Sequence, residues 1–339
     1  MGTVTLVEDH STQYTRLVEL AAAALVVLRD SSQEMSDALR LPDIAVKFRI
    51  TDTFVSEVNS GRDPDRPPFG AERAGGTVAA ITLQDKAQAG SHLVLVNGAA
   101  LGSEPWHATH IPATIAHELS HCLTEECRLL HGHPKSYSAS PGNPIEVTGF
   151  IALRLWDEYL ADSLAMTLMP PMSFTLNADD GPLTATDRLV LGADRLAIMH
   201  EALDQHAYPG LGNLVRAHLR SHADLSEMTT TVLVRVQEVL TMGVHFQTAL
   251  REFPHTDELD RVERHAGFKL YIAPFWESVG PVFDGAVAAC FTDFAATEQR
   301  CFDSANAAVI TMCRSLGLTF ELLESGEVFV WVNEPTELS

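Results

Sequence analysis

His117, Glu118 and His121 belong to the segment His-Glu-Leu-Ser-His, which is an HExxH motif. Residues four apart lie on one face of an α-helix, so the two imidazoles can converge on one metal ion. Glu118 projects close to that face, where it can take a proton from metal-bound water and return it to a leaving amine. Because a bound metal lowers the pKa of such water and polarises carbonyl groups, the motif predicts a hydrolytic metal site.

A second segment supplies the acidic residues that complete such a site. Glu158 and Asp162 stand four apart and therefore share one face of a helix. We expect Glu158 to be the third ligand, which leaves a fourth position for water or substrate. Asp157 and Glu146 are its principal competitors. We expect Asp162 to accept a hydrogen bond from a liganding imidazole and to fix its tautomer.

The sequence HELSH followed by DEYLADSLAMTLMP resembles the ImmA/IrrE family of metallopeptidases and, more broadly, the gluzincins. The resemblance covers about residues 111–171. It includes Ala161, which precedes the final acid of the second motif, and the turn Leu168-Met169-Pro170 that ends the helix. The connection between the two motifs is fairly long, and the chain beyond Pro171 has no match to the family.

This resemblance implies one zinc ion per chain, bound by His117, His121 and Glu158, with Glu118 as the general base. It implies a zinc-dependent peptidase with a protein or peptide substrate, which could be a regulatory protein. The substrates of family members do not transfer through a shared metal site. The alternative is a non-enzymatic regulatory or partner-binding protein with a structural metal site. The intact Glu118 disfavours that alternative.

Other residues near the motifs could stabilise an oxyanion or gate the cleft, although each is more simply explained as structural. Four are histidines and two are tyrosines: His107, His110, His131, His133, Tyr137 and Tyr159. Packing is the default role for Tyr159, because it lies beside the expected ligand. Cys122 and Cys127 follow the motif closely, but we interpret them as small buried apolar residues.

Two helices must position these residues. The first is predicted over 111–126, with Pro112 in its first turn and an apolar stripe of Ile111, Ile115, Leu119 and Cys122. The second is predicted over 148–169 and is ended by Pro170 and Pro171. A helix over 12–28 is also expected.

The predicted fold class is α+β, a zincin-like core with a small β-sheet and the HExxH helix, followed by a mainly helical C-terminal half. Strands are predicted over 44–50, 77–83 and 92–96, the last two as a hairpin, with a loop over 59–76. Such a sheet offers an edge to which an extended peptide could add. The predicted division is 1–175 for the metallopeptidase domain and 176–339 for a helical region with a terminal hairpin over 318–332.

The charge balance excludes one class of partner. The chain has 23 Lys and Arg against 45 Asp and Glu, a formal net charge of −22, so nonspecific binding to nucleic acid is not expected. Five cysteines without a CxxC pair fit reduced thiols. The N-terminal residues lack the pattern of an export signal, and no apolar run is long enough for a membrane span. These features predict a cytoplasmic protein.

Overall fold

The computed structural model describes residues 3–6, 45–60, 69–73, 76–77, 80–84, 91–103, 110–130, 143–168, 199–204, 210–221, 224–250, 257–289 and 293–336. The helix predicted over 12–28 lies outside these residues. The described part is mostly helical with small sheets, which confirms the coarse α+β class. None of its helices is long and apolar enough to cross a membrane.

By compactness the chain falls into two units. The first comprises Met1–Pro134 and Leu160–Gly192, and the second comprises Lys135–Tyr159 and Ala193–Ser339. One division falls inside helix α5 (Pro144–Leu168), which is continuous and contributes residues to both units. The domain boundary predicted near residue 175 stays a prediction.

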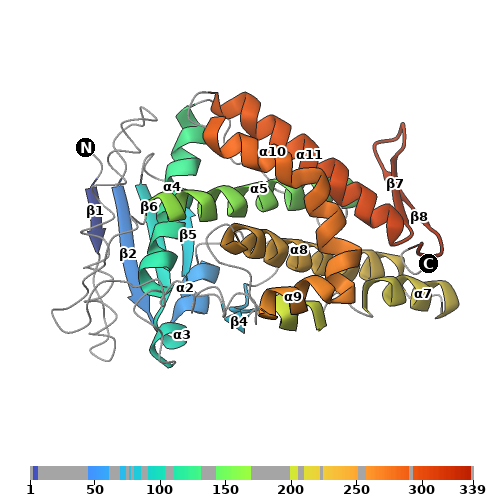
Figure 1. Ribbon diagram of the computed structural model, residues 1–339, viewed down its shortest axis with the longest axis horizontal. Helices are drawn as coiled ribbons and strands as arrows, with labels where there is room; N and C mark the ends of the chain where they lie inside the picture. Colours follow the sequence, from blue (N-terminus) through green and yellow to red (C-terminus); the bar gives the residue numbers. More distant parts are fainter. Residues whose placement is uncertain are drawn as a thin grey trace. The chain divides into compact units, whose positions relative to one another are not determined.

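The first unit contains a four-stranded sheet with the order β1-β2-β6-β5 (Figure 1). The strands β1 (Thr3–Leu6), β2 (Ala45–Thr51) and β6 (Ser91–Asn97) are parallel, whereas β5 (Ala80–Gln84) runs antiparallel to β6. Val46, Phe48 and Ile50 of β2 are buried, as their alternation predicts. The antiparallel pairing of β5 with β6 agrees with the predicted hairpin, whereas β1 was not predicted.

Several short elements accompany the sheet in the first unit. Helix α2 (Phe54–Ser60) packs on β6 through a small core of Phe54, Val58, Phe69 and Leu95. Helix α3 (Gly98–Ser103) follows β6 directly. The segment predicted as a loop over 59–76 in fact includes the end of α2 and the strand β3 (Glu72–Arg73), which pairs with β4 (Gly76–Thr77).

Helix α4 (His110–Leu130) carries the HExxH motif and packs on β5. In the predicted stripe Ile115, Leu119 and Cys122 are buried, whereas the side chain of Ile111 lies outside the described part of the chain. The helix continues four residues past the predicted end at residue 126. Cys127 and Arg128 in the extra turn are buried, whereas Leu130 at its end is exposed.

The second unit is built mainly from helices, as predicted for the region after residue 175. Besides its part of α5 it contains α7 (Gly210–Ser221), α8 (Leu225–Leu250), α9 (Asp257–Arg264), η3 (Phe268–Ile272), α10 (Ala273–Ala289) and α11 (Phe294–Ser315). Helices α10 and α11 pack against each other (Figure 1). The π-helical turn η3 packs on α8, where Ile272 lies against Gly243.

The described chain ends in a β-hairpin of β7 (Leu318–Leu322) and β8 (Val328–Val332), in the region where the sequence predicts one. Gly326 adopts a φ of 83° in the turn, a conformation that favours glycine. Gly317 has a φ of 85° between α11 and β7, and its carbonyl accepts a hydrogen bond from the Asn333 backbone N–H at 2.8 Å. A Cβ at residue 317 would lie 2.1 Å from the Asn333 carbonyl oxygen, so only glycine fits there.

Candidate metal centre

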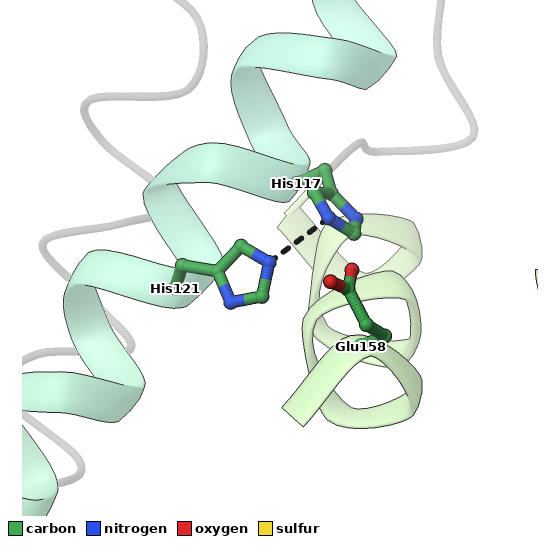
Figure 2. Close-up of side chains that lie close together, drawn as sticks. All are labelled: His117, His121 and Glu158. Atoms are coloured by element: carbon green, nitrogen blue, oxygen red, sulfur yellow. Dashed lines mark hydrogen bonds between the residues drawn. The ribbon is translucent and has the colours of Figure 1, made fainter. Parts of the chain in front are cut away.

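The two motif histidines face each other on consecutive turns of α4 (Figure 2). The Nε2 atom of His121 lies 3.0 Å from the Nε2 atom of His117, and the ring planes are nearly perpendicular. Two nitrogen ligands of a tetrahedral zinc ion, each about 2.0–2.1 Å from the metal, lie about 3.3 Å apart. The histidine pair is therefore close to the separation that a shared metal ion requires.

Asp162 of α5 fixes one of these rings. Its Oδ1 atom lies 2.8 Å from Nδ1 of His117, and both residues belong to the first unit. An ionised carboxylate can only accept, so Nδ1 carries the hydrogen and donates it. The lone pair of His117 is then on Nε2, the nitrogen that faces His121. This is the arrangement in which a carboxylate orients a metal-binding imidazole.

Glu158 lies one turn before Asp162 on the same continuous helix. Glu158 and Asp162 therefore project from the same face of α5. Ligand atoms of His117, His121 and Glu158 all lie within 4.8 Å of one another, and Figure 2 shows the carboxylate turned toward the imidazoles. These three residues could bind a metal ion.

The competing acids do not join this group. Among the described residues no metal-binding group contains Glu146 or Asp157. Glu146 instead accepts a hydrogen bond of 2.9 Å from the Asn143 side chain at the start of α5. Asp157 is buried one residue before Glu158 and therefore projects from a different face of the helix.

Glu118 is buried and has a partner that the sequence did not indicate. The hydroxyl group of Thr82 in β5 donates a hydrogen bond of 2.6 Å to Oε2 of Glu118. The same hydroxyl lies 3.3 Å from the backbone oxygen of Glu118. Thr82 thus holds the expected general base from the edge strand of the sheet. A strand was predicted there, but no pattern marked this hydroxyl among the other residues of the strand.

Two basic side chains of the second unit lie next to Glu158. Nη2 of Arg154, one turn earlier on α5, is 3.2 Å from Oε1 of Glu158. Nε2 of His245 on α8 is 3.9 Å from Oε2. Sequence reasoning missed both residues. The spacing of four between Arg154 and Glu158 could have indicated the first, whereas His245 is far from Glu158 along the chain and only the fold brings them together.

The tyrosine beside the ligand has a packing role. The ring of Tyr159 is buried against Trp156, Trp276 and Phe283, and its hydroxyl donates a hydrogen bond to Asp284. This contact engages its only O–H hydrogen. The other oxyanion candidates, His107, His131, His133 and Tyr137, lie outside the described residues, as does the side chain of His110.

The cysteines of α4 behave as buried apolar residues. Cys122 and Cys127 are buried, and none of the four described cysteines forms a disulfide. Burial, together with the nearby Glu118 carboxylate, raises the pKa of the Cys122 thiol. Because the thiolate is the form that binds metal, Cys122 is poorly suited to be a ligand.

A buried pair ties the motif helix to the sheet within the first unit. Nε2 of His92 in β6 lies 2.7 Å from Oε1 of Glu126 on α4, and both side chains are almost completely buried. Together with the contact of Thr82 with Glu118, this gives α4 two polar attachments to neighbouring strands. The attachments fix the rotation of the helix, so the two motif histidines keep one orientation.

Comparisons of the chain with protein-family models, with curated proteins and with solved structures give no match. The fold and the site therefore define the chain as an α+β protein with a candidate metal-binding group. The similarity to ImmA/IrrE metallopeptidases rests on the two motifs alone.

Proposed function

We propose that this chain is a zinc-dependent peptidase of the ImmA/IrrE-like, gluzincin type with a zincin-like core. The observation that carries the proposal is the convergence of His117, His121 and Glu158, with Glu118 next to the first ligand. Two imidazole nitrogens and one carboxylate oxygen are a ligand set that catalytic zinc uses, and they leave one position for water or substrate.

Each residue has a defined task in this proposal. His117, His121 and Glu158 would hold the zinc, and Asp162 would keep the Nε2 lone pair of His117 directed at it. Zinc, when bound, lowers the pKa of a water molecule and polarises the substrate carbonyl. Glu118 would serve as the general base, accepting a proton from the attacking water and returning it to the leaving amine. Thr82 holds one oxygen of Glu118, so the other oxygen can serve as the base.

The sheet of the first unit supports an extended peptide as the substrate. Among the described strands β5 pairs only with β6, so no described strand occupies its other edge. Thr82, which contacts Glu118, lies in the middle of β5. A peptide added at this edge would form main-chain hydrogen bonds close to the general base. We therefore propose that the chain acts on a protein or peptide substrate in the cytoplasm. Binding to nucleic acid is not part of the proposal.

A regulatory protein with a structural zinc site is the alternative. Structural sites close with four protein ligands, whereas hydrolytic sites keep one position open. The candidate group in the described part of the chain has three members. A general base would have no task in a structural site, whereas here Glu118 is buried and held by a hydrogen bond.

Two measurements test the proposal together. Metal analysis of the purified protein should give about one zinc per chain, and substitution of His117, His121 or Glu158 by Ala should weaken binding severely. Incubation with a proteome-derived peptide library, followed by mass spectrometry, should reveal cleavages that a chelator abolishes and added zinc restores. A full zinc content in Glu158→Ala would show that Glu158 is not the third ligand. A zinc-loaded wild-type protein that cleaves nothing would favour the structural alternative.

A further inference from the structure

The two oxygens of the Glu158 carboxylate have different surroundings. Oε1 lies 3.2 Å from Nη2 of Arg154 and forms an ion pair with it. Oε2 lies 3.9 Å from Nε2 of His245, which is beyond hydrogen-bond distance. Arg154, Glu158 and His245 all belong to the second unit, and the first two share helix α5. The carboxylate therefore presents one oxygen engaged by a guanidinium group and a second that is not held by it.

We propose that Arg154 is a positioning residue that keeps Glu158 a one-oxygen metal ligand. The inference rests on the proposed zinc site. Two imidazoles and one carboxylate oxygen occupy three of four tetrahedral positions, whereas binding through both carboxylate oxygens would fill the fourth. The guanidinium charge is paired with Oε1, so it competes with a cation for that oxygen. Arg154 thereby preserves the position that water needs.

The ion pair between Arg154 and Glu158 is better suited to orienting the carboxylate than to stabilising the fold. The side chain of Arg154 is 30 % exposed, and ion pairs of this exposure contribute little to the free energy of unfolding. The spacing of four residues on one helix sets the geometry without help from other elements. A planar guanidinium group with several donors holds a carboxylate in one orientation better than a lysine ammonium does.

Cobalt substitution tests this role without any substrate. Co²⁺ replaces zinc in such sites, and four-coordinate Co²⁺ absorbs visible light more strongly than five-coordinate Co²⁺. We expect Arg154→Met to lower the absorption of the cobalt protein and Arg154→Lys to give an intermediate spectrum. Zinc affinity from chelator competition should change by about 10-fold or more in Arg154→Met, as is usual for partners of metal ligands.

The matched control is Arg264→Met, which removes another arginine paired four residues away, with Asp260 at 3.8 Å on α9. This variant should keep the wild-type spectrum. A folded Arg154→Met protein with wild-type spectrum and zinc affinity would overturn the role of Arg154 while leaving the proposed zinc site intact. A wild-type chain that binds neither cobalt nor zinc would overturn the proposed function itself.

A second and independent feature is an aromatic face on the terminal hairpin. Phe329 and Trp331 of β8 are 46 % and 53 % exposed, and their ring centroids lie 4.8 Å apart. Alternate residues of a strand share one face, and the register puts Glu321 opposite Phe329 on that face. Nε1 of Trp331 donates a hydrogen bond of 2.9 Å to Glu321. Two aromatic rings and a carboxylate thus form one exposed surface, which we call the hairpin face.

The charges around the hairpin face select its partner. The segment 318–336 contains no Lys, Arg or His and has four exposed glutamates: Glu321, Glu324, Glu327 and Glu334. Glu334 is paired with Arg216 of α7 at 3.7 Å, which leaves the other three to give the hairpin its negative charge. Two copies of this acidic segment would repel each other, so a second copy of the chain is disfavoured. A Lys or Arg side chain could instead lie over the Trp331 ring and pair with Glu321.

We infer that the hairpin face binds an extended basic segment of another protein, added as a strand along β8. Among the described strands β8 pairs only with β7, so no described strand occupies its other edge. A strand added there would present alternate side chains to the hairpin face, which suits a sequence that alternates basic and apolar residues. Exposed clusters of large apolar side chains commonly mark such interaction sites.

Dye-labelled peptides test this surface by fluorescence polarisation. A peptide of alternating Lys and Val should bind the wild-type chain, and one of alternating Glu and Val should not. Trp331→Ser should weaken binding at least tenfold, whereas Val234→Ser, which removes an exposed apolar residue of α8, should not. N-methylation of alternate amides in the Lys-Val peptide should abolish binding, because it removes donors for the strand ladder.

Equal binding by Trp331→Ser or by the methylated peptide would overturn the inference, because it would indicate diffuse attraction to the acidic chain. Sedimentation identifies the competing occupant. A dimer of the wild-type chain that Trp331→Ser converts to a monomer would show that a second copy covers the hairpin face, against this inference.

Discussion

The Nδ1 atom of His117 lies 2.8 Å from Oδ1 of Asp162, a carboxylate whose side chain is 3 % exposed. A buried carboxylate needs such a partner, since an unpaired buried charge is costly. The contact joins α4 to α5 within the first unit. It therefore serves the packing of the two helices and the orientation of a proposed metal ligand.

Asp162→Ala tests the role of this contact in orienting the proposed metal ligand. We expect zinc affinity or turnover to fall about 10–100-fold, because an unanchored imidazole is a poorer ligand. Asp162→Asn keeps the size and an acceptor oxygen, so it should lose less. Chelator competition measures the affinity. Unchanged zinc affinity together with unchanged turnover in Asp162→Ala would show that Asp162 has no role in the metal site.

Thr82→Val should lower turnover about 10-fold, because the loss of a hydrogen bond to a charged group costs about 1.5–3 kcal/mol and leaves Glu118 less well placed. Zinc content should stay at the wild-type level, since Thr82 contacts the base and none of the proposed ligands. Thr53→Val is the matched control, as it removes a threonine hydroxyl that donates to Glu57 at 2.9 Å. If both variants lost turnover equally, the special position of Thr82 would be refuted.

Tyr159→Phe distinguishes packing from catalysis. The ring stays in its aromatic cluster, and only the hydrogen bond to the exposed Asp284 is lost. We expect a loss of about 0.5–1.5 kcal/mol in the free energy of unfolding, measured by urea denaturation, with turnover nearly unchanged. A large loss of turnover with unchanged stability would instead indicate that Tyr159 stabilises an oxyanion during catalysis.

Cys122 and Cys313 should resist alkylation in the folded protein. Burial raises the pKa of Cys313 to about 12 and also raises that of Cys122. The thiolate is the reactive form, so a raised pKa keeps both groups protonated and unreactive near pH 8. Iodoacetamide treatment followed by peptide mapping should find both unmodified until denaturant is added. Rapid labelling of either residue in the native protein would contradict its buried placement.

The local pattern of the sequence predicted the two helices of the site and the main strands of the sheet. Periodic apolar residues and flanking prolines mark α4 and α5, and alternation marks β2. Strand β1 was missed because its four residues are too few to show a pattern. The parallel pairing of β2 with β6 is equally invisible in the sequence, because it depends on which distant segments meet.

The same distinction applies to the site. His117 and His121 could be predicted to share a face because helical spacing determines which side chains of one helix lie together. Glu158 could be singled out by its spacing from Asp162 and by the resemblance of its segment to the gluzincin motif. Thr82 and His245 could not be predicted, since each reaches its glutamate through contacts between elements that are distant in sequence. Motif residues therefore follow from local geometry, whereas their supporting partners follow from tertiary packing.

The most direct test of the central claim compares the wild type with Glu118→Gln in zinc content and in turnover of a cleaved peptide. Glutamine preserves the size of the side chain and can still accept a hydrogen bond from Thr82, but it cannot take the proton from water. We predict full zinc content and a native fold, with turnover lower by at least about 10²–10⁴-fold. Wild-type turnover in zinc-loaded Glu118→Gln would contradict the proposed mechanism.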